Sequence, residues 1–137
     1  MKKLLFATTP EKSLFSEFSL TLLRVAFGLL LAGLHGAGKV PPSSQLIGGV
    51  EAMGFPMPTL FAWLAGLAEL AGGIFLAVGF LTRPSAFFIA VTMFVAAFGK
   101  HLEDPWKVKE LSFIYLCIAL VFVVRGANKF SIDRFIK

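Results

Sequence analysis

The chain has 137 residues, of which 57% are hydrophobic and only 15% are charged. A soluble globular domain carries about 25% charged residues, so this composition excludes an ordinary soluble domain and indicates a membrane protein. The formal net charge is +5, but the basic residues flank apolar segments and form no stripe, which argues against nucleic-acid binding. The single cysteine, Cys117, permits neither an intramolecular disulfide nor a CxxC redox pair.

The N-terminus begins like a signal peptide, with Lys2 and Lys3 before an apolar stretch. That stretch is only LLFA, which is shorter than the 7–15 residues of a signal-peptide core. The first long apolar segment is therefore predicted to be a retained helix.

Four apolar runs predict four membrane-spanning helices, at residues 18–38, 60–80, 84–101 and 110–125. The last is the shortest, because its apolar part covers only 111–124. The short connection between the second and third runs favours antiparallel neighbours. We therefore expect a single domain over 1–137, with an all-α fold in which a polytopic membrane four-helix bundle spans the bilayer.

The distribution of Lys and Arg predicts the orientation of this bundle. Eight basic residues fall on the side that holds both termini, and four fall on the other side. The first group is Lys2, Lys3, Lys12, Arg83, Arg125, Lys129, Arg134 and Lys137; the second is Lys39, Lys100, Lys107 and Lys109. Both termini are therefore predicted to be cytoplasmic.

The connection between the first two runs contains Leu46, Ile47, Val50 and Met53 at helical spacing. This pattern predicts a short helix lying flat on the outer membrane surface. An unstructured loop is the alternative for the same stretch.

Glu69 is the only charged residue in the second run, LFAWLAGLAELAGGIFLAVGF. A carboxylate at this depth costs about 3 kcal/mol, so it needs a partner. Its helical face also carries Ala65 and Gly73, small residues that let another helix approach, and this predicts that Glu69 points into the bundle. Arg24 lies about 9 Å and Glu69 about 16 Å from the cytoplasmic side at 1.5 Å per residue. We therefore predict an Arg24–Glu69 ion pair.

A second polar group is predicted near the outer side, made of His35, Lys39, His101 and Glu110. In span one, Arg24, His35 and Lys39 fall within one sector of about 80° at ideal helical spacing. Simpler interpretations stay open for these residues. The Arg24–Glu69 pair can be purely structural, the histidines can lie among the headgroups, Lys39 can be an interfacial anchor, and Glu110 can favour a helix N-terminus.

The same residues give only a weak indication of a metal site. His35, His101 and Glu110 match a catalytic zinc set in residue type but come from three segments without local ligand spacing. No metal is therefore predicted. The sequence also contains no Gly-rich phosphate loop, no GxSxG motif and no dinucleotide fingerprint.

Five motifs recur in an order that is fairly specific. They are HGAGK at 35–39, GFPMP at 54–58, AGLAELAGGIFLAVGFLTR at 65–83, KHLED at 100–104 and GANKFSID at 126–133. With an arginine early in span one, the chain resembles the DoxX family of small four-helix bacterial membrane proteins from about Leu22 to Asp133. Ala127 departs from the glycine or proline that is usual in the last motif.

The resemblance implies a multi-pass protein of the bacterial inner membrane with a redox association. Some members of the family are the membrane subunit of thiosulfate:quinone oxidoreductase, and others are linked to thiol and oxidative stress. The site residues carried over by the resemblance are Arg24, His35, Lys39, Glu69, His101 and Glu110.

The first functional hypothesis is a quinone-linked oxidoreductase or its membrane subunit. In this hypothesis His35 or His101 hydrogen-bonds a quinone oxygen, and Glu69 or Glu110 relays protons. Lys39 attracts an anionic reductant, and Arg24 helps to bind the ligand. Because the chain has no dithiol motif or redox-centre motif, electrons come directly from a substrate or from a redox partner protein.

The second hypothesis is a non-catalytic module that binds a lipid-like ligand or docks a partner helix. The ridge formed by Gly28, Ala32 and Gly36 would be its helix-docking face. A transporter is a third hypothesis, which requires a homo-oligomer because four spans are few for a pathway.

Overall fold

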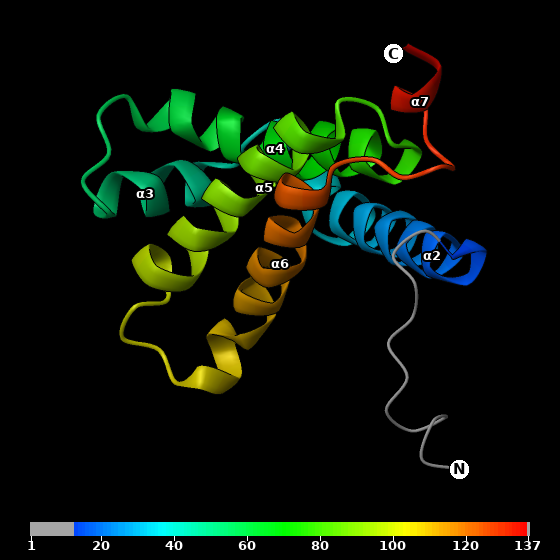
Figure 1. Cartoon of the computed structure of the whole chain (residues 1–137). Coiled ribbons are helices and arrows are strands. Elements are labelled where there is room, and N and C mark those ends of the chain that lie inside the picture. Colours follow the sequence, from blue (N-terminus) through cyan, green and yellow to red (C-terminus); the bar gives the residue numbers. More distant parts are fainter. Residues whose placement is uncertain (1–12, 137) are drawn as a thin grey trace.

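The computed structural model describes residues 13–136, and all regular secondary structure in this range is helical. The predictions for the N-terminal stretch, including the sides assigned to Lys2, Lys3, Lys12 and Lys137, lie outside the described residues. The helices are α2 (Leu14–Leu30), the π-helix η1 (Leu31–Gly36), the 3-10 turn η2 (Ala37–Lys39), α3 (Ser44–Ala52), α4 (Pro58–Val78), α5 (Thr82–Val95), the π-helix η3 (Ala96–Lys100), α6 (Trp106–Arg125) and α7 (Asp133–Ile136) (Figure 1).

Three helical rods are long and apolar enough to cross a membrane, at Leu14–Lys39, Pro58–Val78 and Thr82–Lys100. They confirm three of the four predicted spans. The first begins four residues earlier than predicted, because the Ser13 hydroxyl accepts a hydrogen bond from the Ser16 N–H (3.1 Å) and caps the helix. The fourth predicted span corresponds to α6, which packs along α5 and begins with a charged stretch that includes Lys107, Lys109 and Glu110.

The predicted helix in the first connection is present as α3. Its N-cap, Ser43, accepts a hydrogen bond from the Leu46 N–H (3.2 Å), and Val50 is buried on the side that packs near α4. The helix is therefore confirmed against the alternative of an unstructured loop. Its place on the membrane surface stays a prediction.

The first rod changes pitch before it ends. Its backbone runs as an α-helix to Leu30, then as a π-helix over Leu31–Gly36 and a 3-10 turn over Ala37–Lys39. A change of helix type rotates the residues that follow relative to an ideal α-helix. The sector predicted to hold Arg24, His35 and Lys39 together is therefore not preserved, and the three side chains have separate contacts.

Glycines bring the backbones of α2–η2 and α4 into direct contact. A Cβ added to Gly36 would lie 2.5 Å from the Leu70 nitrogen, and one added to Gly66 would lie 2.7 Å from the Lys39 carbonyl oxygen. A Cβ on Gly28 would collide with the Gly73 carbonyl. The predicted small-residue ridge is thus a helix-docking face, and its partner is α4 of the same chain.

We expect Gly36→Ala to destabilise the protein by about 1–3 kcal/mol, because the added methyl group pushes η1 away from α4. Gly33→Ala is the matched control in the same π-helix, since nothing lies within 4 Å of its added Cβ. The control should leave stability unchanged or slightly raised. SDS titration of the purified protein in mixed micelles measures the free energy of unfolding of both variants. Equal destabilisation by Gly36→Ala and Gly33→Ala would contradict the close contact between η1 and α4.

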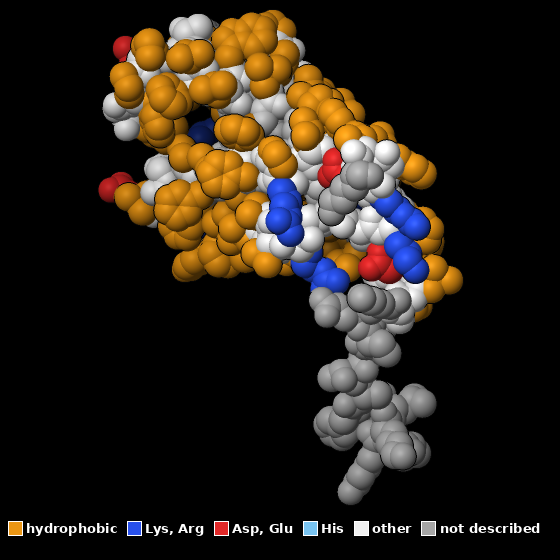
Figure 2. Space-filling view, turned by 45° about the horizontal axis from the view of Figure 1, so that its top comes forward, with side chains coloured by type: hydrophobic (Ala, Val, Ile, Leu, Met, Phe, Trp, Pro, Cys, Tyr) orange, Lys and Arg blue, Asp and Glu red, His pale blue; other side chains and the backbone are white. Residues whose placement is uncertain are grey.

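The core lies where α2, α4, α5 and α6 meet. Its largest buried members are Phe27, Leu31, Leu76, Ile89, Met93, Leu116 and Phe122. The outer surface is also apolar, with Phe15, Leu34, Phe87 and Val124 each more than half exposed, and Figure 2 shows hydrophobic side chains over most of one face. An apolar exterior of this extent is suited to lipid.

A segment that we call the strap, residues 126–133, returns from the end of α6 across one end of the bundle (Figure 1). The Asn128 side-chain amide donates to the Glu17 carbonyl (2.8 Å) and to the Thr21 hydroxyl (2.7 Å) on α2. The Lys129 N–H donates to the Glu17 carboxylate (2.7 Å). The strap therefore joins the end of α6 to the beginning of α2, and this contact gives the GANKFSID motif a structural role.

The strap also holds the turn between α4 and α5. The Asp133 carboxylate accepts hydrogen bonds from the N–H groups of Leu81 (2.7 Å) and Thr82 (2.9 Å), which would otherwise lack partners at the start of α5. Partial burial by itself raises the pKa of Asp133, but the hydrogen bonds from Thr82 and Leu81 and the charge of Arg24 outweigh it, and the net pKa is lowered.

This lowered pKa predicts an acid-dependent loss of stability. Because the folded pKa lies below the unfolded value of about 3.9, Asp133 stabilises the protein above that pH and loses its contribution as the pH falls through the folded pKa. Asp133→Asn should be less stable at pH 7 and should lose less of its stability than the unchanged protein between pH 5 and about 2.5. Thermal unfolding across this range measures the difference, and parallel pH profiles would contradict it.

Candidate functional site

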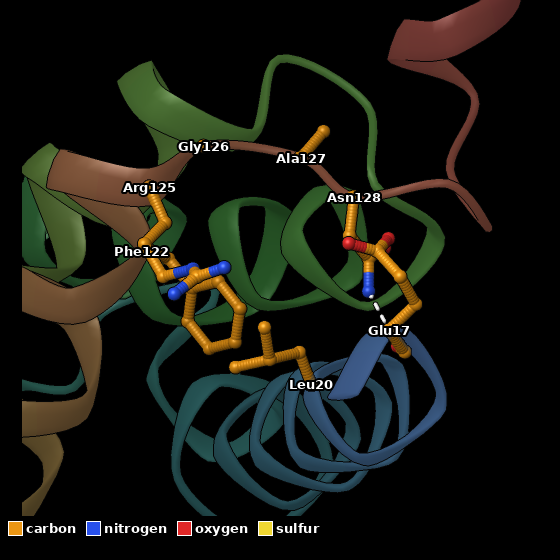
Figure 3. Close-up of a pocket in the computed structure, with 7 residues that line it drawn as sticks. All are labelled: Glu17, Leu20, Phe122, Arg125, Gly126, Ala127 and Asn128. Atoms are coloured by element: carbon orange, nitrogen blue, oxygen red, sulfur yellow. Dashed lines mark hydrogen bonds between the residues drawn. The ribbon is translucent and has the colours of Figure 1, made fainter. Parts of the chain in front are cut away.

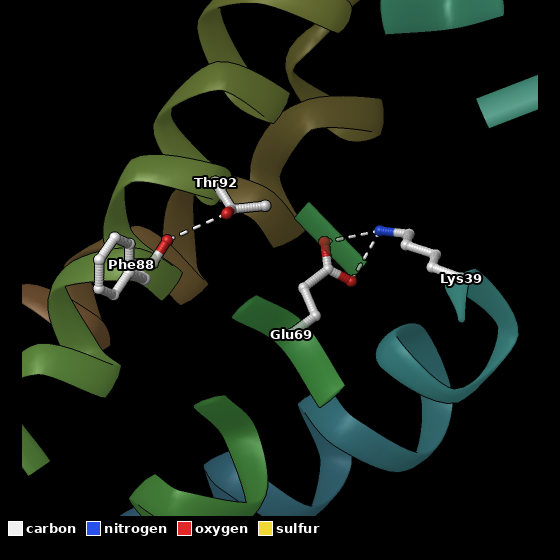
Figure 4. A network of polar contacts seen from close by, with 4 residues as sticks. All are labelled: Lys39, Glu69, Phe88 and Thr92. Carbon is white, nitrogen blue, oxygen red and sulfur yellow. Dashed lines mark hydrogen bonds and ion pairs between the residues drawn. The ribbon is translucent and has the colours of Figure 1, made fainter. Parts of the chain in front are cut away.

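Glu69 lies in the middle of α4 with 1% of its surface exposed. Both of its carboxylate oxygens accept hydrogen bonds from the ammonium group of Lys39, at 2.6 and 2.7 Å (Figure 4). The prediction that Glu69 points into the bundle and has a basic partner is confirmed. The prediction that this partner is Arg24 is wrong.

The register between the first rod and α4 explains the correction. Lys39 packs against Gly66, whereas Arg24 packs against Gly79 at the other end of α4. Gly79 is ten residues from Glu69, about 15 Å along a helix. Counting depth from the ends of the apolar runs missed this offset, because backbone contacts between the two helices set their axial register, and the ends of the runs do not reveal those contacts.

Arg24 is also 1% exposed, but it belongs to the strap end of the bundle. Its Nη2 atom donates to the Phe130 carbonyl (2.6 Å), and its guanidinium lies against Gly79, at the C-terminus of α4. The negative end of the α4 dipole and nearby Asp133 offset part of the cost of burying its positive charge. Arg24 therefore fastens the strap to α2 and makes no contact with Glu69.

Only one member of the Lys39–Glu69 pair is buried. The Lys39 side chain is 35% exposed, whereas that of Glu69 is 2% exposed. Because the two charges neutralise one another, the pair has little net attraction for an anion. A proton can nevertheless pass between the carboxylate and the ammonium group across a distance of 2.6 Å.

An aromatic cluster joins α6 to the first rod. The Tyr115 ring of α6 makes edge-to-face contacts with His35 (5.5 Å between ring centres) and with Phe27 (5.3 Å), and Tyr115 is near enough to Glu69 to be affected by its charge. Sequence reasoning missed Tyr115. The available signal was that it is the single tyrosine in a chain with sixteen phenylalanines.

The other two predicted members of the outer cluster lie elsewhere. His101 follows η3, where its Nδ1 atom is 2.6 Å from a carboxylate oxygen of Asp104 in the α5–α6 connection. Glu110 is exposed near the start of α6. The structure thus pairs Lys39 with Glu69 and brings His35 against Tyr115, and it adds none of Arg24, His101 and Glu110 to these contacts. The catalytic roles of His101 and Glu110 stay predictions.

The weak zinc interpretation is not supported by this geometry. Within the part of the chain that the structure describes, no three His, Cys, Asp or Glu side chains are grouped closely enough to hold a metal ion.

Known proteins resemble this chain over most of its length. An uncharacterised protein of Haemophilus influenzae is 30% identical over 128 residues, covering 88% of this chain and 92% of that protein. The inner membrane protein YphA of Escherichia coli is 28% identical, covering 93% of this chain and 92% of that protein. A Bacillus subtilis protein named "Putative oxidoreductase CatD" is 25% identical, covering 88% of each chain. No solved structure matches the chain significantly.

The three apolar rods and the inner-membrane relatives place the protein in the bacterial inner membrane. The family model described as DoxX matches residues 19–102, which include the first rod from Ser19, α3, α4 and α5, and therefore both members of the Lys39–Glu69 pair. This match and the similarity to the Haemophilus protein confirm the resemblance seen in the motifs. The chain therefore belongs to the DoxX family.

Proposed function

We propose first that α6 is the fourth span and that both termini face the cytoplasm. The strap ties the end of α6 to the start of α2 and to the α4–α5 turn, so these points lie at one end of the bundle. The end of the third rod lies at the other end, since α5 runs away from that turn. The chain must therefore cross once more, through α6, to reach the strap. The sequence count of Lys and Arg, eight on the side predicted to hold both termini against four on the other, supports a cytoplasmic position for that side.

We propose that the protein serves a quinone-linked redox process in the inner membrane. The single observation that carries this proposal is the Lys39–Glu69 pair, an ionisable pair near the middle of a span with one member accessible from outside. Ionisable groups at such depth are rare and are associated with proton pathways and ligands. The name of the relative CatD describes an oxidoreductase, which supports the same class of function.

The residues beside the pair suit a quinone ring. Among the residues described, neither His35 nor the Tyr115 hydroxyl has a hydrogen-bond partner in another side chain or in the backbone. Both groups can therefore donate to a quinone oxygen. The apolar surroundings on α2 and α6, including Phe27, would accommodate the ring and exclude water.

A quinone, when bound, accepts two electrons and two protons to become a quinol, and the electrons must come from a reductant or a partner protein. In this chain Glu69 would hold a proton on its carboxylate during each cycle, and Lys39 would stabilise the ionised form before reprotonation. His35 or Tyr115 would orient the ring. Because the charge of Glu69 neutralises that of Lys39, we do not assign Lys39 the role of attracting an anionic reductant.

The test uses the full chain in native nanodiscs prepared from its own membranes. Bound quinone is extracted and quantified, and reduction of decylubiquinone by the same membranes is followed with thiosulfate or a thiol as reductant. Glu69→Gln should retain quinone and lower turnover by about 100-fold or more, as expected for loss of a proton-transfer group. Glu51→Gln, an exposed glutamate of α3, is the matched control and should retain turnover.

The proposal fails if the unchanged protein retains no quinone and shows no reductant-dependent turnover with its membrane partners present. Retention of a second protein, or of a phospholipid that Glu69→Gln releases, would instead support the non-catalytic binding module. The glycine ridge would not be the docking face of such a module, because α4 already covers it.

A further inference from the structure

Four basic side chains gather at the strap end of the bundle, and we call them the strap-end patch: Arg83, Arg125, Lys129 and Arg134. Arg83 lies next to the end of α6, where its Nη2 atom donates to the Val124 carbonyl (3.2 Å). Arg134 lies next to Lys129, to whose carbonyl it donates (3.3 Å). Figure 2 shows Lys and Arg side chains collected in one region of a surface that is otherwise largely hydrophobic.

The carboxylates of this region do not neutralise the patch. Glu17 accepts the backbone N–H of Lys129 (2.7 Å), and Asp133 accepts those of Leu81 and Thr82. Between residues 13 and 136, the ion pairs are Lys39–Glu69 and His101–Asp104, both outside the patch. The four cations outnumber these two carboxylates, so the patch keeps a net positive charge for a ligand.

Two hollows adjoin these cations. The smaller, of about 60 Å³, is lined by Arg125 together with Leu20, Phe122 and Asn128, and Figure 3 shows the Arg125 guanidinium turned towards it beside the Phe122 ring. The larger, of about 360 Å³, lies further along the strap and is lined by Lys129, Arg134, the buried Ser131 and the Asp133 carboxylate. Glu17 and Asn128 line both hollows, so the two are neighbours.

Apolar side chains beside the patch indicate where its ligand comes from. Val124 is 75% exposed, and Phe135 on α7 is 86% exposed. Exposed aliphatic and aromatic groups next to unpaired cations match the boundary between acyl chains and charged headgroups. A free phosphate ion would use the cations and leave these apolar groups without a role.

We propose that the strap-end patch binds the phosphate headgroup of an anionic phospholipid. Arg125 and Lys129 would hold the headgroup from the two neighbouring hollows, and Val124 and Phe135 would contact its acyl chains. The ligand would thereby fasten the strap, and with it α2 and the α4–α5 turn, to the membrane surface. This site is separate from the Lys39–Glu69 pair and does not depend on the redox proposal.

The test compares phosphatidylglycerol with phosphatidylcholine. The full-length protein is stripped of lipid, incubated with an equimolar mixture of the two, and released from detergent into a native mass spectrometer that counts the retained lipids. Arg125→Gln/Lys129→Gln removes two charges from the patch. Lys100→Gln/Lys107→Gln removes two charges from exposed positions on either side of the α5–α6 connection and is the matched control. A third arm adds inorganic phosphate.

The unchanged protein should prefer phosphatidylglycerol, and the patch variant should lose about tenfold of that preference, as expected for two cations near a headgroup. The control should keep its preference within about twofold. Equal retention of the two lipids by the unchanged protein, or an equal loss in both variants, would overturn the proposal. Displacement of the lipid by inorganic phosphate would show a free-phosphate site and would overturn it as well. The comparison of the two lipids in the unchanged protein tests the proposal even if a variant does not fold.

Discussion

Lys39→Met is expected to lower the free energy of unfolding by about 3 kcal/mol, because it leaves the Glu69 carboxylate buried without a counter-charge. Glu69→Gln should cost less, about 1 kcal/mol, because Lys39 is 35% exposed and can turn its ammonium group towards solvent or headgroups. The asymmetry follows from the difference in burial between the two partners. A surface ion pair would show two small and similar effects.

The double variant Lys39→Met/Glu69→Gln completes the comparison. It should be more stable than Lys39→Met alone, since the second change removes the charge that the first left unpaired. Unfolding by SDS titration of the purified protein measures all three variants under one condition. If the double variant were destabilised, relative to the unchanged protein, by the sum of the two single effects, the two side chains would be acting independently and the pairing would be refuted.

Arg24→Ala is expected to lower the free energy of unfolding by about 3 kcal/mol. It removes a fully buried side chain, leaves a cavity between α2 and the end of α4, and takes the charged donor from the Phe130 carbonyl. The strap should then detach at that point. Hydrogen exchange at the N–H groups of Ile132 and Asp133, which donate to the carbonyls of Val78 and Gly79, should become faster.

Arg83→Ala is the control for this prediction. Arg83 also donates to a backbone carbonyl, that of Val124, but its side chain is exposed. Its removal should change stability by no more than about 0.5 kcal/mol. If Arg24→Ala were as mild as Arg83→Ala, or left exchange in the strap unchanged, Arg24 would not be the residue that fastens the strap.

The sequence by itself was sufficient for the parts of this protein that depend on local pattern. Long apolar runs predicted the bounds of three rods to within a few residues. A helix that crosses a bilayer needs about 20 consecutive apolar residues, and a run of that length is recognisable in the sequence. Spacing identified α3 and the inward direction of Glu69, because helical periodicity relates neighbours within a few turns. Ordered motifs identified the family.

Only the tertiary structure decided which polar residues meet. Lys39 and Glu69 come from two different helices, and their meeting depends on the register that the contacts at Gly36 and Gly66 impose. A π-helix in the first rod changes the rotation of its final residues, and nothing in the apolar pattern marks it. Arg24 and Phe130 are 106 residues apart in the chain. Periodicity orders residues along one helix, whereas axial offset and rotation between helices are set by backbone contact, and these two quantities selected Lys39 over Arg24 as the partner of Glu69.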